Sequence, residues 1–142
     1  MLKKFALSTL AILIILSLCI PIASASSDTT TNVIKPMWTY LQLVHNGLQI
    51  DSSGLATMVS EINCYTGTVN KVRMDNYLQR YINGSWTTLN SWSQTTYDTY
   101  DYWGTTYYVY QGYNYRLLTY FYAYNGNTLL ESTSLTTGIK SY

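Results

Sequence analysis

The sequence predicts an all-β protein, an antiparallel β-sandwich of about seven strands that follows a signal peptide. Composition is the first reason. The chain holds 16 tyrosines and four tryptophans, all after residue 37, among many Thr, Ser and Asn residues. Aromatic and β-branched side chains suit a pleated, half-buried surface. The second reason is spacing, because short alternating segments recur between turn signals about every 10 to 20 residues.

The first 25 residues predict secretion. Lys3 and Lys4 precede an apolar run over residues 5–22, and Ala23-Ser24-Ala25 follows it. A basic start, a short apolar core and an A-x-A site are typical of a cleaved signal peptide. A retained membrane anchor and a lipid anchor on Cys19 are the alternatives. Cleavage predicts a secreted or cell-wall-associated protein with no stable membrane insertion.

The mature chain divides into a linker, one domain and a tail. Residues 26–35 are polar and Thr-rich, which is typical of a disordered linker. The domain is expected over residues 36–135, and residues 136–142 are expected to form a frayed C-terminal tail. The predicted strands cover residues 38–45 (continued by Leu48 and Ile50), 55–65, 71–82, 86–92, 105–111, 115–124 and 128–135.

The pattern leaves the third segment open. In residues 71–82, Val72, Met74, Leu78 and Ile82 fit one face of a strand, but part of this set also fits a helical stripe. Asn83-Gly84 follows directly and favours a hairpin, because both residues readily take the positive φ of a type I′ turn. Residues 93–104 are polar and rich in tyrosine, and they are expected to form a long irregular connection.

Charge and cysteine content exclude several classes of function. Without Lys3 and Lys4, six Lys/Arg face seven Asp/Glu, which gives a net charge of −1. This offers no electrostatic attraction for nucleic acid. Only Cys64 remains after cleavage, so the domain has no internal disulfide and must be stabilised by its core. Cys64 lies on the apolar face of its segment, and we expect a buried structural thiol.

Two resemblances specify the fold further. The segment Gly112-Tyr113-Asn114-Tyr115-Arg116-Leu117 resembles the entry to strand F of fibronectin type III domains. That resemblance implies an immunoglobulin-like (fibronectin type III-like) sandwich with Tyr115 as its tyrosine corner. Most of residues 36–135 is also similar to an uncharacterised family of small secreted proteins from Gram-positive bacteria. The similarity is carried by residues 36–40, 78–80, 84–86 and 112–116.

The sequence shows no reactive group in a catalytic setting. His45 is the chain's one histidine, and a hydrolytic triad needs an oriented base beside its nucleophile. One histidine and one cysteine 19 residues apart do not make a metal-ligand cluster. We therefore expect no enzyme activity, no metal and no cofactor.

The aromatic side chains are the best candidates for binding. Tyr97, Tyr100, Tyr102 and Trp103 fall within the expected connection, and loop aromatics suit interfaces and sugar faces. Structural roles are expected for Tyr115, Trp38, Trp86 and Cys64. The loop aromatics favour a non-catalytic module that recognises a cell-wall glycan or an extracellular protein. The alternative is a structural or self-associating coat protein, because Tyr-rich strands with little charge are prone to edge pairing.

Overall fold

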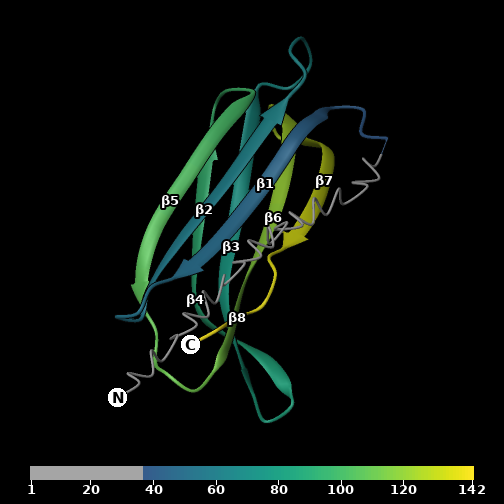
Figure 1. Ribbon diagram of the computed structural model, residues 1–142. Helices are drawn as coiled ribbons and strands as arrows, with labels where there is room; N and C mark the ends of the chain where they lie inside the picture. The colour runs from purple at the N-terminus through teal and green to yellow at the C-terminus, as the bar shows by residue number, and fades with distance from the viewer. Residues whose placement is uncertain (1–36) are drawn as a thin grey trace, which may run out of the picture. The chain divides into compact units, whose positions relative to one another are not determined.

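A computed structural model describes residues 37–142, so the predicted signal peptide and linker lie outside the described residues. The described residues form eight strands (Figure 1). They are β1 (Leu41–Ile50), β2 (Leu55–Cys64), β3 (Lys71–Ile82), β4 (Ser85–Thr96), β5 (Tyr100–Tyr108), β6 (Asn114–Asn125), β7 (Thr128–Thr136) and the short β8 (Lys140–Ser141).

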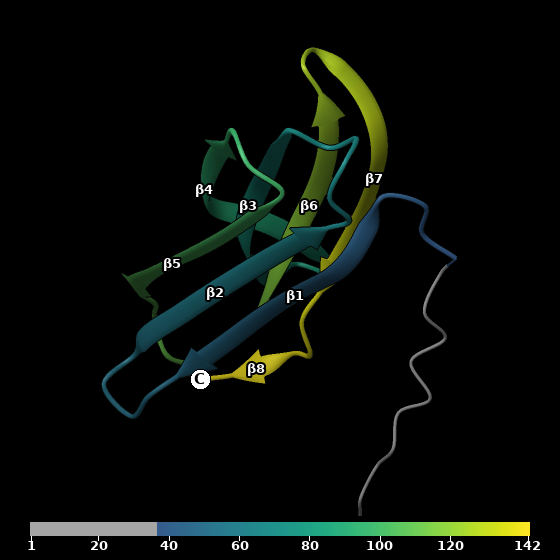
Figure 2. The same cartoon turned by 90° about the horizontal axis from the view of Figure 1, so that it is seen from above.

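The strands form two antiparallel sheets that pack face to face (Figure 2). One sheet has the order β1-β2-β5 and the other has the order β4-β3-β6-β7, with β8 also pairing to β6. The chain crosses between the sheets after β2, after β4 and after β5. This confirms the predicted immunoglobulin-like antiparallel sandwich of about seven strands.

Residues 71–82, which the pattern left between strand and helix, form strand β3. Its alternate residues Val72, Met74 and Leu78 are fully buried between the sheets. The hairpin to β4 turns at Asn83 (φ 52°) and Gly84 (φ 81°). Both residues take the positive φ that a type I′ turn requires. The local turn residues therefore settled an ambiguity that apolar periodicity could not.

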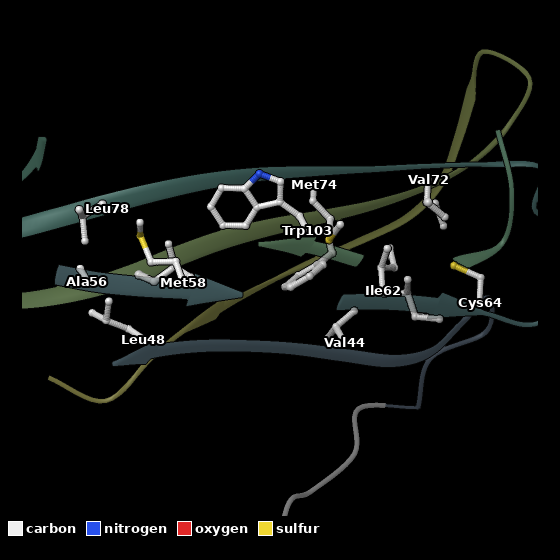
Figure 3. Close-up of a cluster of buried hydrophobic side chains, with 14 of the residues drawn as sticks. Val44, Leu48, Ala56, Met58, Ile62, Cys64, Val72, Met74, Leu78 and Trp103 are labelled. Atoms are coloured by element: carbon white, nitrogen blue, oxygen red, sulfur yellow. The ribbon is translucent and has the colours of Figure 1, made fainter. Parts of the chain in front are cut away.

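The core lies between the sheets and combines residues from both (Figure 3). Met58, Ile62 and Cys64 come from β2, and they face Val72 and Met74 of β3. A polar cluster interrupts this apolar layer. The Oδ1 atom of Asn76 accepts hydrogen bonds from Ser60 (2.7 Å) and Thr119 (2.8 Å), and all three side chains are fully buried.

The prediction of a long irregular connection over residues 93–104 is wrong. Strand β4 continues to Thr96 and β5 begins at Tyr100, so only residues 97–99 link them. Polar side chains occupy inward positions there and hid the alternation. The amide Nε2 of Gln94 donates to both carboxylate oxygens of Asp101, at 2.8 and 2.9 Å. The pair satisfies the hydrogen bonding of two polar groups near the core, as burial demands.

The expected frayed tail over residues 136–142 is also wrong. The hydroxyl of Thr137 accepts a hydrogen bond from the backbone N–H of Leu117 at 3.0 Å, and β8 pairs with the start of β6. Tyr142 exchanges backbone hydrogen bonds with Tyr113 at 3.0 Å in each direction. These contacts join the segment to the sheet, although its polar sequence gives no strand pattern.

The tyrosine corner at Tyr115 is confirmed. Its ring is fully buried, and its hydroxyl donates to the carbonyl of Tyr110, five residues upstream, at 2.6 Å. Burial raises the pKa of this hydroxyl, so the proton needed for donation stays in place. The bond fixes the connection between β5 and β6 against the sheet.

Removing this hydroxyl should therefore weaken the fold. We expect Tyr115→Phe to lower the free energy of unfolding by about 1–2 kcal/mol, because it leaves a carbonyl without its partner. Denaturant unfolding measures the change, with Tyr113→Phe as the control on a half-buried neighbouring tyrosine. Equal unfolding midpoints for Tyr115→Phe and the unmodified chain would contradict this role.

The other residues expected to be structural have different environments. Trp38 is partly buried and packs against the core, and Cys64 lies within the core. Burial raises the pKa of the Cys64 thiol to about 11, and the Glu131 carboxylate adds to the rise. Such a thiol is neutral at physiological pH, which suits a structural side chain. Trp86 is not part of the core and lies on the outer face of the β4–β3–β6–β7 sheet.

Candidate functional site

The four aromatic residues expected to bind a ligand do not form one patch. Tyr97 lies in the turn between β4 and β5 and is 84% exposed. Tyr100 and Tyr102 lie on β5 and point outward from the β1–β2–β5 sheet, about half exposed. Trp103 is only 8% exposed and points into the core, where Figure 3 shows its indole beside Met74.

Trp103 closes the side of the sandwich where β4 and β5 lie in different sheets. Its ring lies 5.5 Å from that of Trp92 on β4, and the Trp92 ring lies 6.2 Å from that of Tyr107. Tilted and edge-on aromatic pairs at these distances are favourable. Part of the aromatic density in the sequence therefore covers the core.

A second aromatic group gathers on the outer face of the larger sheet. We call it the aromatic face and define it by six side chains from β3, β4 and β6: Tyr77, Tyr81, Trp86, Tyr120, Tyr122 and Tyr124. Strand pairing brings them together. Asp75 lies opposite Tyr120, Tyr77 opposite Leu118, and Tyr81 opposite Trp86. Within the face, the rings of Tyr77 and Tyr120 meet edge-on at 5.9 Å.

Basic side chains lie over these rings. The Nζ atom of Lys71 is 4.7 Å from the ring centre of Tyr124, and the guanidinium of Arg73 is 5.7 Å from the ring centre of Tyr122. A third stack is the shortest of the three, with the guanidinium of Arg116 4.2 Å from the ring of Trp86. Cation–π contacts of this kind attract and also hold long side chains in place.

Two hollows open on this side of the sheet. One, of about 440 Å³, is lined by Tyr77, Gln79, Thr88, Leu118, Tyr120 and Tyr122. The other, of about 500 Å³, is lined by Tyr81, Gly112, Tyr113, Asn114, Ser141 and Tyr142. Both combine aromatic rings with amide or hydroxyl groups. Gln79 lines the first hollow, and its strand pair with Arg116 lies next to the pair Tyr81–Asn114, which lines the second.

One carboxylate belongs to this face, and it is fully engaged. The Asp75 carboxylate accepts hydrogen bonds from Nε of Arg73 (2.9 Å) and from the hydroxyl of Ser93. It also forms an ion pair with a terminal nitrogen of Arg73 at 2.8 Å. The hydrogen bond that Arg73 donates to the Asp75 carboxylate raises the pKa of Arg73. Burial, followed by the nearby Asp75 charge, raises the pKa of Tyr122. Tyr122 thus keeps its hydroxyl proton and can donate to a ligand.

The chemically reactive residues lie away from the aromatic face. His45 is on β1 in the other sheet, paired across the strands with Glu61. Among residues 37–142 there is no group of three or more His, Cys, Asp or Glu side chains placed to hold a metal ion. That same part of the chain contains no helix with the length and apolar character required to cross a bilayer.

The sequence contained a partial signal for this site. The alternation of Tyr120, Tyr122 and Tyr124 places them on one face of a single strand. It could not show which residues of β3 and β4 lie beside them, because strand register depends on pairing between distant segments. Arg116 lies on the same strand as these tyrosines and was visible beside them in the sequence, whereas Gln79 and Tyr77 are site residues that the sequence did not identify.

Comparison with known proteins gives little information about function. No protein-family profile matches the chain, and no curated protein matches it. Among solved structures, a β-glycosidase from Bacteroides vulgatus is similar over 67% of this chain, with 17% identity and a TM-score of 0.42. The chain spans only 12% of that protein's length.

Proposed function

We propose that this chain is a secreted, non-catalytic recognition module that binds a glycan through the aromatic face. One observation carries the proposal: the 440 Å³ hollow joins three tyrosines to the polar side chains of Gln79 and Thr88 on an open sheet surface. Sugars present both apolar ring faces and hydroxyl groups. A site that combines flat rings with a few polar groups fits both.

The exposure of these residues supports binding over structural cover. Tyr120 is 39% exposed and Tyr81 is 41% exposed, although both belong to strands that bury their opposite faces. An aromatic patch that remains open on a small domain is typical of an interaction surface. The core does not depend on it, because Phe121 and Leu117 fill the inner face of the same strand.

The experiment is a binding screen with matched aromatic variants. The secreted chain is tested by affinity electrophoresis against soluble polysaccharides and by pull-down on isolated cell walls. Tyr120→Ala combined with Tyr122→Ala should abolish retention, because a central aromatic residue at an interface contributes about 2 kcal/mol or more. This double variant must first show an unfolding transition like that of the unmodified chain.

The control is Tyr100→Ala combined with Tyr102→Ala, which removes two exposed tyrosines from the other sheet. This variant should bind like the unmodified chain. The opposite pattern, in which the control loses binding and the Tyr120/Tyr122 variant keeps it, would place the site on β5 and contradict the proposal.

One observation favours a second candidate, a self-associating coat or matrix protein. Strand β4 is an edge of its sheet and carries no charged residue over Ser85–Thr96. Charged side chains are a common protection against edge-to-edge pairing. Sedimentation at several protein concentrations separates the candidates, since a recognition module stays monomeric and a coat protein grows into larger assemblies.

A further inference from the structure

We propose that the glycan is anionic and that Arg116 binds its acidic group, a carboxylate or a phosphate. This inference rests on the proposed function, since it names the class of glycan that the aromatic face takes. It is carried by the distribution of charge over the sandwich, by the geometry of Arg116 and by the position of Arg116 beside residues that line the two hollows.

The charge on the aromatic face is positive. Lys71, Arg73 and Arg116 lie there with a single carboxylate, Asp75, which Arg73 neutralises through two contacts of 2.8 and 2.9 Å. No carboxylate on this face offsets the positive charges of Lys71 and Arg116. The other acidic residues of the described chain lie elsewhere, at Asp51, Glu61, Asp98, Asp101 and Glu131. A ligand on this face therefore meets net positive charge on a chain with little charge overall.

Arg116 is held in position with its terminal nitrogens available. Its guanidinium lies 4.2 Å from the ring centre of Trp86, and its Nε donates to Oε1 of Gln79 at 2.8 Å. Within residues 37–142, no hydrogen bond uses its two terminal nitrogens. A guanidinium can bind a carboxylate or a phosphate through two parallel N–H groups. Because stacking already fixes the plane, less side-chain entropy is lost when an anion binds.

The position of Arg116 suits a chain of sugars. Its strand partner Gln79 lines the 440 Å³ hollow, and the next outward-facing pair along β3 and β6, Tyr81–Asn114, lines the 500 Å³ hollow. Sugar rings in the two hollows would place the link between them, or a substituent of either ring, near the guanidinium. Lys71 is less available, because its ammonium already donates to Asn127 at 3.3 Å and lies against Tyr124.

The test compares acidic and neutral forms of one polymer. Binding of the unmodified chain is measured with polygalacturonate, with its fully methyl-esterified form and with a glycerol-phosphate polymer. Polygalacturonate should bind about tenfold or more tighter than its ester, as expected for a charge-assisted contact, and its affinity should fall with added salt. Tight binding of the phosphate polymer instead would identify phosphate as the acidic group.

Variants then assign the contact to one residue. Arg116→Gln should remove the preference for the acidic polymer, and Arg116→Lys, which keeps the charge without the two-pronged contact, should retain part of it. Lys140→Gln removes a positive charge on β8 and should leave the preference intact. Unfolding curves for all variants check that the sandwich is preserved.

Two outcomes would overturn the inference, and they can be distinguished. If acidic and esterified polymers bind equally and Arg116→Gln changes nothing, while Tyr120→Ala with Tyr122→Ala still abolishes binding, the glycan is neutral and the proposed function stands. If neither the charged polymers nor neutral polysaccharides bind, the proposed function fails together with this inference.

Discussion

Replacing Trp103 by alanine should lower the free energy of unfolding by about 3–5 kcal/mol, the range for removing a large aromatic side chain from a core. The indole is 8% exposed and packs at a tilt against Trp92, where β4 and β5 meet without sharing a sheet. No backbone ladder joins these two strands, so side-chain packing must hold this side together. Chemical denaturation followed by circular dichroism measures the loss.

Tyr102 is the matched control for this substitution. It is adjacent in sequence but points outward and is 53% exposed, so Tyr102→Ala should change the free energy of unfolding by less than about 1 kcal/mol. Similar losses for the two variants would contradict the division of β5 into a buried and an exposed face.

Asn76→Asp should produce the second large effect, and that effect should depend on pH. Asn76 is fully buried, and its Oδ1 accepts from Ser60 and Thr119. An aspartate there would be buried without a cation, so its pKa should rise on folding. A raised folded pKa means that stability is present below the unfolded value of about 3.9 and is lost as the pH rises through the folded value.

At pH 7 the loss should reach about 3–5 kcal/mol, as for other uncompensated buried charges. Urea unfolding at pH 3.5 and at pH 7 measures it. Asn63→Asp is the control, because Asn63 is half-buried on the same β2 strand that carries Ser60. A variant Asn76→Asp that is equally stable at both pH values would show that the cluster is open to water.

Much of the fold follows from local sequence alone. Alternation marked six of the seven main strands, and Asn83-Gly84 fixed the hairpin that made β3 a strand. Tyr115 and the residues before it indicated the tyrosine corner, because this contact spans only five residues. Such features depend on interactions between residues close in the chain, which a sequence displays directly.

Other features depend on distant partners and could not be predicted. The sequence pattern placed Gln94 and Asp101 in a connection, because the hydrogen bonds between them form only when β4 and β5 lie side by side. Residues 137–142 join the sheet through Leu117 and Tyr113, far back in the chain. The aromatic face has the same origin, since it is assembled from β3, β4 and β6 by their register.

The aromatic residues therefore divide into two groups by their position in the fold. Trp92, Trp103 and Tyr107 close the sandwich from inside, and the sequence placed Trp103 wrongly in a binding loop. Tyr77, Tyr120 and Tyr122 lie around an open hollow with polar neighbours. Composition alone could not separate these groups, because tyrosine and tryptophan suit both burial and recognition.

The central claim is that ligand binds on the aromatic face, and an NMR titration tests it most directly. Uniformly ¹⁵N-labelled protein is titrated with a soluble oligosaccharide of the glycan that retains the unmodified chain. We predict that amide shifts concentrate in β3 and β6, around Tyr77, Gln79, Arg116 and Tyr120, and that β5 and the turn at Tyr97 remain unchanged. Shifts confined to residues 97–102 would contradict the account and return the binding site to the turn and β5.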